Sequence, residues 1–165
     1  MKKIIFLFLL LPNIILSQSF KYSSGGNPID GEYKFAYVSS YEGGEFPYQD
    51  ATIYLNKLSG GSTNLYISGT GFYMEDFSEV QVYFVFDEED DIYISTTVSY
   101  SSDNESIFVS SFRDSKTGVR YDRGHILAKL KESNSLYMRV EDSGVKNDYM
   151  FDLSGSAKAI AFVLE

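Results

Sequence analysis

The sequence contains no cysteine and no tryptophan, and it has one histidine in 165 residues. Without cysteine, the chain can form no disulfide and no thiol-ligated metal site. The single histidine, His125, cannot supply the multiple nitrogen ligands of hydrolytic zinc sites. A Gly-x-Ser-x-Gly turn that would present a nucleophilic serine is also missing. We therefore expect no enzymatic activity, and paired-carboxylate hydrolysis is the one enzyme chemistry that the composition leaves open.

Basic residues are scarce. The chain has 14 lysines and arginines against 23 aspartates and glutamates, which gives a net charge of −9. Nucleic acids and anionic membranes bind through basic surfaces. We therefore expect neither as a partner.

A long apolar run occurs only at the start of the chain. Lys2 and Lys3 precede the almost wholly apolar residues 4–16, and the small residue Ser17 follows. This layout is typical of a secretory signal peptide, and the run is shorter than the roughly 20 residues that span a bilayer. We predict a signal peptide over 1–17 and a single domain over 18–165. The protein would then be exported by a bacterium to the periplasm or the outside, with no membrane span after cleavage.

The remaining sequence is rich in Tyr, Phe, Ile and Val, separated by Gly, Ser, Asn and Asp clusters. Alternating apolar residues between such turn signals indicate short strands. We predict strands over 32–39, 52–58, 64–68, 80–86, 92–100, 106–112, 136–141 and 148–153. Strands at this spacing predict a mainly β fold, an antiparallel β-sandwich or a barrel-like domain.

Two stretches depart from this alternation. Over 122–132 the apolar residues share one helical face, Asp122 is placed to cap the N-terminus, and Lys129 and Lys131 suit the C-terminal end. A second helix is predicted from Ser156, as N-cap, to the end of the chain, although its last residues would also suit a strand.

The last 45 residues or so combine a short amphipathic helix from His125 to Glu132, the strand Leu136-Tyr-Met-Arg-Val, and a strand that ends in Phe151-Asp-Leu-Ser-Gly-Ser-Ala-Lys-Ala-Ile160. This arrangement resembles the end of the small exported β-sandwich proteins of the invasion-associated locus B type, where a strand also ends in a glycine followed by an alanine-containing helix. The resemblance implies an exported β-sandwich that is not an enzyme.

Tyrosine is abundant, with 14 copies, and it recurs between two apolar residues. The repeated pattern places five tyrosines on strand faces opposite their apolar neighbours: Tyr54, Tyr66, Tyr83, Tyr93 and Tyr137. Pairing Phe86 with Ile92 across the hairpin would turn Tyr83 and Tyr93 outward together. Exposed tyrosines can contact sugar rings or a protein partner, although tyrosine also favours strands without any ligand.

Residues 87–91 form an acidic run, and 75–79 add further carboxylates. Asp87, Glu89 and Asp91 are candidate Ca²⁺ ligands, but a charged hairpin tip also discourages strand aggregation. The leading interpretation is a non-enzymatic protein that binds another protein or an envelope glycan. The alternatives are a Ca²⁺-dependent or carbohydrate-binding module using 75–91 and the tyrosine face, and a carboxylate-pair hydrolase.

Overall fold

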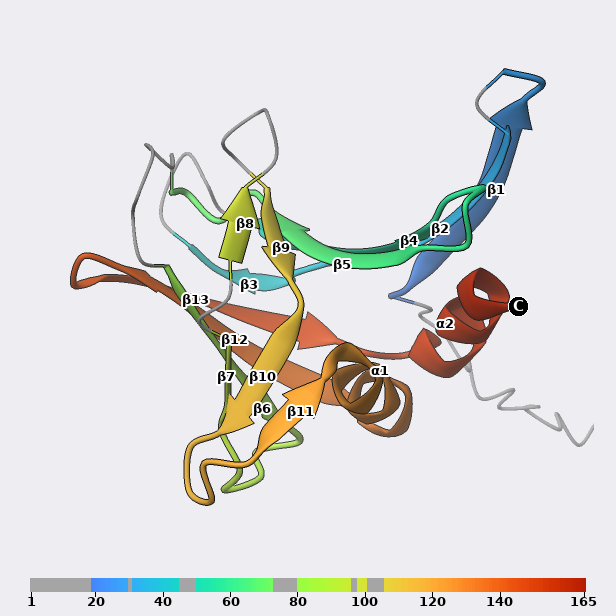
Figure 1. Cartoon of the computed structure of the whole chain (residues 1–165). Coiled ribbons are helices and arrows are strands. Elements are labelled where there is room, and N and C mark those ends of the chain that lie inside the picture. Colours follow the sequence, from blue (N-terminus) through green and yellow to red (C-terminus); the bar gives the residue numbers. More distant parts are fainter. Residues whose placement is uncertain (1–18, 30, 45–49, 73–79, 96–97, 101–105) are drawn as a thin grey trace, which may run out of the picture.

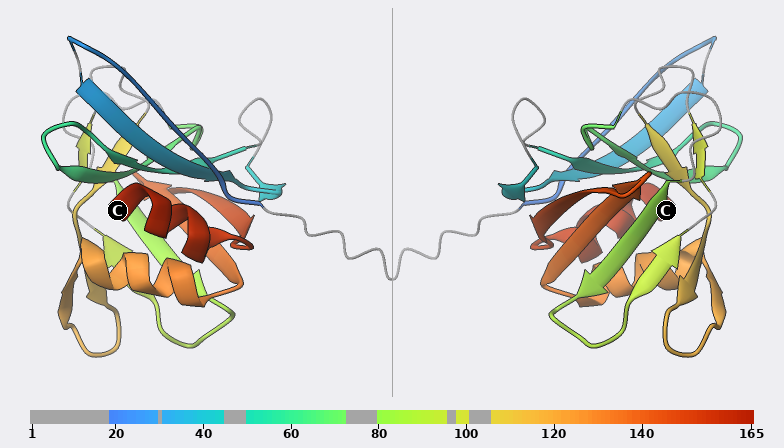
Figure 2. Two further views of the ribbon diagram at one scale, coloured as in Figure 1. Left: turned by 90° about the vertical axis from the view of Figure 1, so that its right-hand side faces the viewer. Right: turned by 90° about the vertical axis from the view of Figure 1, so that its left-hand side faces the viewer.

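The computed structural model describes residues 19–29, 31–44, 50–72, 80–95, 98–100 and 106–165; the predicted signal peptide lies outside them. Two antiparallel sheets pack as layers, with two helices along one side (Figure 1, Figure 2). The six-stranded sheet has the order β1 (Lys21–Asn27), β2 (Gly31–Ser39), β4 (Thr52–Lys57), β5 (Thr63–Ser68), β9 (Ile107–Val109) and β8 (Val98–Tyr100). The prediction of a mainly β fold is confirmed.

The seven-stranded sheet forms the second layer. Its order is β11 (Arg120–Asp122), β10 (Ser111–Asp114), β7 (Tyr93–Ser95), β6 (Gln81–Phe86), β12 (Ser135–Asp142), β13 (Val145–Asp152) and β3 (Glu42–Gly43). Each sheet keeps two edge strands, so the described chain forms a sandwich and not a barrel.

Two of the predicted strands each contribute to both sheets. The stretch 92–100 contains β7 and β8, and the stretch 106–112 contains β9 and the start of β10, with the members of each pair in different sheets. Such changes of sheet form the corners of a sandwich. Strand β1 was not predicted, because KYSSGGN lacks apolar alternation. It nevertheless pairs all seven of its residues with β2.

The two helices differ in how they begin. In α1 (Arg123–Glu132), the Asp122 side chain accepts a hydrogen bond from the backbone N–H of His125, which confirms the predicted cap. In α2 (Ser156–Leu164), the predicted N-cap Ser156 is wrong, since Ser156 lies buried inside the helix. The N-cap is Gly155, whose left-handed backbone (φ 85°) turns the chain from β13 into α2 without a side-chain bond.

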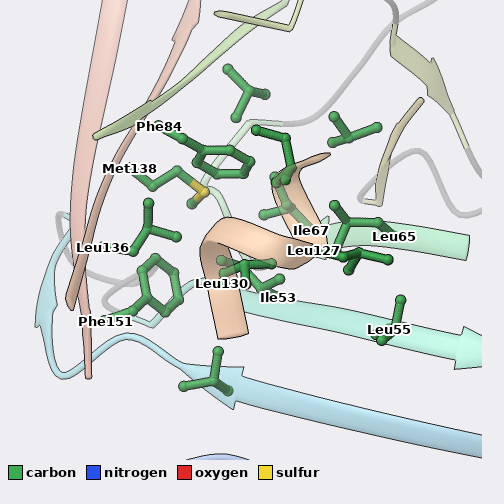
Figure 3. Close-up of a cluster of buried hydrophobic side chains, with 14 of the residues drawn as sticks. Ile53, Leu55, Leu65, Ile67, Phe84, Leu127, Leu130, Leu136, Met138 and Phe151 are labelled. Atoms are coloured by element: carbon green, nitrogen blue, oxygen red, sulfur yellow. The ribbon is translucent and has the colours of Figure 1, made fainter. Parts of the chain in front are cut away.

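The core lies between the sheets and beneath the helices. Ile126, Leu127 and Leu130 of α1 are buried there, as predicted from their helical spacing. Figure 3 shows Leu127 and Leu130 among side chains from both sheets. Burial of each such side chain contributes about 1.5–3 kcal/mol. Both helices lie on the inner side of the six-stranded sheet, and no helix of the described residues covers its outer side (Figure 1).

Candidate functional site

The outer face of the six-stranded sheet carries a continuous series of aromatic rings. On β2, Ala36 and Val38 point into the core, so the alternate positions point outward. Each ring of the series contacts the next, with centroid separations from 4.8 to 6.2 Å. We call this series the aromatic row; it consists of Tyr33, Phe35, Tyr37, Tyr54, Tyr66 and Phe108.

Four of these rings cross the sheet at right angles to its strands. Tyr37, Tyr54, Tyr66 and Phe108 are direct partners on β2, β4, β5 and β9. The rings of Tyr54 and Tyr66 are nearly parallel, 6° apart, with centroids 4.8 Å apart. That separation equals the strand spacing, so the two rings cannot both lie flat on the sheet. The two rings therefore overlap and are tilted relative to the sheet. Each ring turns one edge and part of one face toward solvent.

The described surroundings of the aromatic row are polar and carry a single charged group. Phe35 lies in register with Ser23 on one side and Asn56 on the other, and Asn56 pairs with Asn64. Ser39, Thr52 and Ser68 border the opposite side of the row. Among the described residues whose strand positions turn outward here, none is Asp or Glu, and the one charged group is Lys21, which lies over the Tyr37 ring at 5.8 Å.

This neutrality is informative because the whole chain has a net charge of −9. If the 23 aspartates and glutamates were spread evenly over the chain, several of them would be expected on a face of this size. Glu32, the residue before Tyr33 on β2, points to the inner side because successive side chains of a strand alternate between its faces. The face therefore offers aromatic carbon, amides and hydroxyls with almost no net charge.

Strand β1 is shaped to fit the end of the aromatic row. Gly25 pairs with Tyr33, and a Cβ atom at Gly25 would lie 2.5 Å from the Tyr33 hydroxyl. The tyrosine ring therefore covers the glycine, which explains why a strand that lacks apolar alternation contains a glycine at this position.

The outer face of the seven-stranded sheet has a different organisation. Arg139 donates two hydrogen bonds to the Asp148 carboxylate, at 2.6 and 2.9 Å, and a third to the Tyr137 hydroxyl at 2.7 Å. The Tyr83 hydroxyl donates to Gln81 at 2.5 Å. The hydrogen bonds from Arg139 lower the pKa of Asp148, against the opposing effect of burial. We call Tyr83, Tyr137, Arg139 and Asp148 the charged network.

Tyr93 does not belong to an exposed face, and that prediction was wrong. The hairpin pairs Phe84 with Tyr93 and Tyr83 with Ile94, one residue away from the predicted register. A slip of one residue reverses every side chain of a strand. Tyr93 is therefore only 4% exposed and faces the core, while Ile92 is 37% exposed. Asp87 and Glu88 adopt left-handed conformations (φ 47° and 58°), and β6 and β7 are joined by residues 87–92 in place of the predicted 87–91.

The carboxylates of the acidic turn, residues 87–91, do not converge on one point. Asp87 accepts hydrogen bonds from the backbone N–H groups of Asn134 and Ser135, both at 2.8 Å. Glu89 pairs with Lys129 at 2.9 Å and Asp91 with Lys116 at 3.4 Å. Within the described residues, no group of three or more such side chains is close enough to hold a metal ion. The predicted Ca²⁺ contribution of 75–79 lies outside the described residues.

Burial by itself would raise the pKa of the Asp87 carboxyl, but the hydrogen bonds from the backbone of Ser135 and Asn134, together with those from the side chains of Ser135 and Ser133, outweigh it and lower the pKa. Asp87 thus attaches the turn to the start of β12. Asp87, Glu89 and Asp91 thus link the turn to neighbouring elements.

A hollow of about 960 Å³ lies at the end of the β1–β2 hairpin beside the end of α2. It is lined by backbone and by side chains of both charges, including Glu32, Lys34 and Lys57. Lys57 donates to the backbone oxygen of Leu164 at 2.8 Å, and the Lys34 ammonium lies 5.1 Å from the Phe162 ring centroid. Both lysines therefore hold α2 in place, so the flat aromatic row is the stronger candidate for ligand binding.

The structure thus separates the five predicted tyrosines. Tyr54 and Tyr66 stack in the aromatic row, Tyr83 and Tyr137 lie on the opposite face of the sandwich, and Tyr93 is in the core. The prediction missed four members of the row, namely Tyr33, Phe35, Tyr37 and Phe108. A signal was present for three of them, because Tyr-x-Phe-x-Tyr alternates along β2 in the same way as the tyrosines that were selected.

Comparison with protein-family models, curated proteins and solved structures finds no match to this chain. The resemblance to proteins of the invasion-associated locus B type therefore stays a prediction. In the part of the chain that the structure describes, no helix is both long enough and apolar enough to cross a membrane.

Proposed function

We propose that this protein is a non-enzymatic binding protein that holds an uncharged glycan chain against the outer face of its six-stranded sheet. The observation that carries the proposal is the aromatic row, in which six rings in unbroken contact lie on a polar face whose one charged group among the described residues is Lys21. Aromatic rings contact the apolar faces of sugar rings, and Tyr hydroxyls add polar contacts at the ring edge.

The polar residues beside the row support a carbohydrate over a charged ligand. Asn64 provides an amide, and Ser39, Thr52 and Ser68 provide hydroxyls, of which those of Ser39 and Thr52 already share one hydrogen bond. Together these groups can both donate and accept hydrogen bonds. A basic protein partner would be attracted by carboxylates, and an acidic polymer by several cations. This face provides neither group in quantity among its described residues.

The surroundings of His125 support a role without catalysis. The Asp122 carboxylate is bound by the backbone N–H of His125 and so is used in capping α1. The His125 ring stacks on Tyr121, with centroids 3.9 Å apart, and its Nε2 is buried without a hydrogen-bond partner. A histidine that acts as a general base needs an orienting carboxylate and an accessible nitrogen. The Nε2 of His125 is buried, and the neighbouring Asp122 carboxylate is used in the cap.

The signal-like residues 1–17 suggest where the ligand would be found. An exported bacterial protein in the periplasm or outside the cell meets the glycans of the envelope or of the surroundings. A neutral binding face would be suited to these polymers, and a net negative charge elsewhere would keep the protein from adhering to anionic ones.

The test is a binding measurement on matched pairs of variants. We would compare two double variants, one with Tyr54→Ala and Tyr66→Ala and the other with Tyr83→Ala and Tyr137→Ala. Binding would be measured by retention on insoluble neutral polysaccharides and by affinity electrophoresis in soluble ones. The first pair should lose about 2–4 kcal/mol of binding free energy, roughly 30- to 1000-fold in Kd. The second pair, on the charged network, should bind as the unmodified protein does.

Equal losses in both pairs, or no retention of the unmodified protein by any neutral polysaccharide, would contradict the proposal. A protein ligand would appear as saturable binding to an extracted envelope protein that the first pair abolishes. Repeating each measurement with Ca²⁺ and with EDTA tests the Ca²⁺-dependent alternative, and the geometry of Asp87, Glu89 and Asp91 leads us to expect no difference.

A further inference from the structure

The described chain has four sheet edges, and three of them are short. Strands β3, β8 and β11 contain two or three residues each. Proteins commonly limit unwanted strand pairing with short edges. The fourth edge, β1, has seven residues and pairs with β2 along its whole length. Its other side is the one long open strand edge in the described residues.

Strand β1 also lacks the other features that protect an edge. Its sequence is Lys-Tyr-Ser-Ser-Gly-Gly-Asn, so Lys21 at its start is its one charged residue, and it contains no proline. An open edge offers a row of backbone N–H and C=O groups for a further strand. The β1–β2 hairpin also projects beyond the rest of the sandwich, so a partner strand could approach it (Figure 1).

We propose that β1 pairs with β1 of a second copy of this chain, antiparallel and centred on Ser24, to form one continuous twelve-stranded sheet. Centring on Ser24 is the register that uses all seven residues. It places Ser24 opposite Ser24 of the second copy, Ser23 opposite Gly25, Tyr22 opposite Gly26, and Lys21 opposite Asn27.

This register is compatible with the side chains that it brings together. The one charge of the strand lies opposite an amide, so no like charges face each other across the pair. The largest side chain, Tyr22, packs on Phe162 of its own copy, with ring centroids 5.0 Å apart, and it lies opposite a glycine, so no second large side chain competes for that space. Within one copy, Tyr33 likewise lies opposite Gly25.

The pairing has a consequence for the aromatic row. Directly opposite residues of an antiparallel pair point to the same side of a sheet. The outer faces of the two copies would therefore face the same way, and the dimer would present two aromatic rows to one surface. Two rows on one rigid sheet would bind a long polymer with higher avidity than one. The strand pairing itself does not depend on the proposed glycan binding.

The absence of natural cysteine makes the register directly testable. Opposite Cα atoms in an antiparallel pair lie about 4.5 or 5.5 Å apart, within the range of about 4.4–6.8 Å that a disulfide spans. Ser24→Cys should form a covalent dimer under mild oxidation at least about tenfold faster than Ser115→Cys, an exposed control at the turn between β10 and β11. Lys21→Cys and Asn27→Cys should cross-link when mixed and not when oxidised separately.

Sedimentation of the unmodified protein from about 10 μM to about 1 mM should show a reversible dimer, since a single strand pair makes a small interface. Two results would overturn the proposal: Ser24→Cys cross-linking no faster than Ser115→Cys, or a monomer throughout this range. Rapid cross-linking of Ser24→Cys without the mixed Lys21→Cys and Asn27→Cys product would overturn the register. Loss of glycan binding in a protein that still dimerises would count against the proposed function alone.

Discussion

The two outer faces of the sandwich are built from the same local sequence pattern and differ in what surrounds each tyrosine. Tyr54 and Tyr137 each stand between two buried residues of a central strand. Tyr54 has Tyr37 and Tyr66 as cross-strand partners. Tyr137 has Val85 and Met150, and its hydroxyl receives a hydrogen bond from Arg139. The character of a face therefore comes from strand neighbours and not from the pattern along one strand.

This difference determines what each face can gain from a ligand. In the charged network, polar groups of the side chains already bind one another, so a ligand would have to displace existing hydrogen bonds. In the aromatic row, Tyr33 is 43% exposed and the other residues are partly buried. Covering such rings removes apolar area from water at little polar cost. The same rings also stabilise the sheet, by about 0.2–1 kcal/mol for each cross-strand pair.

The largest expected effect, on the free energy of unfolding, tests whether Tyr93 lies in the core and Tyr83 on an outer face. Tyr93→Ala should lower the free energy of unfolding by about 3–5 kcal/mol, because it leaves a cavity between Phe86 and His125 of α1, whose rings contact the Tyr93 ring. Tyr83→Ala, on the neighbouring strand but facing outward, should cost about 1 kcal/mol or less. Urea unfolding of both variants checks this. Similar small costs for both would mean that the hairpin has the originally predicted register.

How much the sequence could reveal follows from this hairpin. Alternation correctly placed Val82, Phe84 and Phe86 in the core, because burial of one face is readable within a single strand. It could not fix the position of β7 relative to β6, because that depends on the backbone conformation of Asp87 and Glu88 and on the hydrogen bonds that Asp87 accepts from residues 47 and 48 positions later.

For the same reason, most members of the aromatic row could be predicted from the sequence, but their assembly into one row could not. Tyr54 and Tyr66 were selected from their local pattern, and Tyr33, Phe35 and Tyr37 could have been selected from theirs. That these rings form one row depends on the order of the strands, with β2 beside β4 and β9 beside β5. Phe108 joins the row because the chain changes sheets after β9, a feature that gave no signal in the composition of 106–112.

The second prediction breaks the charged network without touching the aromatic row. Arg139→Met should lower the free energy of unfolding by about 1–2 kcal/mol, because Arg139 makes two bonds to Asp148 and one to Tyr137. Glycan retention should be unchanged. The matched control is Lys146→Met, whose single contact to Glu141 at 3.6 Å predicts a loss below about 0.5 kcal/mol. Lost retention in Arg139→Met would show that both faces contribute to binding.

The third prediction uses acid to remove the same contact. Bonds from Arg139 hold the pKa of Asp148 below its ordinary value of 3.8. A carboxyl with a lowered folded-state pKa stabilises the protein fully above the unfolded value, and this contribution is lost as the pH falls through the folded value. The difference in melting temperature between the unmodified protein and Arg139→Met should therefore be constant from about pH 7 to about pH 5 and shrink below about pH 4.

Comparing the two proteins at each pH removes the contributions of other carboxyls with lowered pKa, including Asp87 and Asp152. A difference in melting temperature that persists unchanged at low pH would mean that Arg139 stabilises the face by packing of its stem and not through Asp148.

The smallest effect separates the rings of the aromatic row from their hydroxyls. Tyr54→Phe with Tyr66→Phe keeps the stacked carbon surface and removes two polar ends. If the rings carry binding, the Kd for a neutral polysaccharide should rise by about 2- to 5-fold, equivalent to about 0.5–1 kcal/mol of lost hydrogen bonding. The same measurement on Tyr83→Phe with Tyr137→Phe should give no change. A loss as large as that of the double alanine variant would show that the hydroxyls, and not the rings, hold the ligand. The aromatic row would then bind through the hydroxyl-bearing edges of its rings. These edges are the part of each tilted ring that its stacked neighbour leaves most open to solvent.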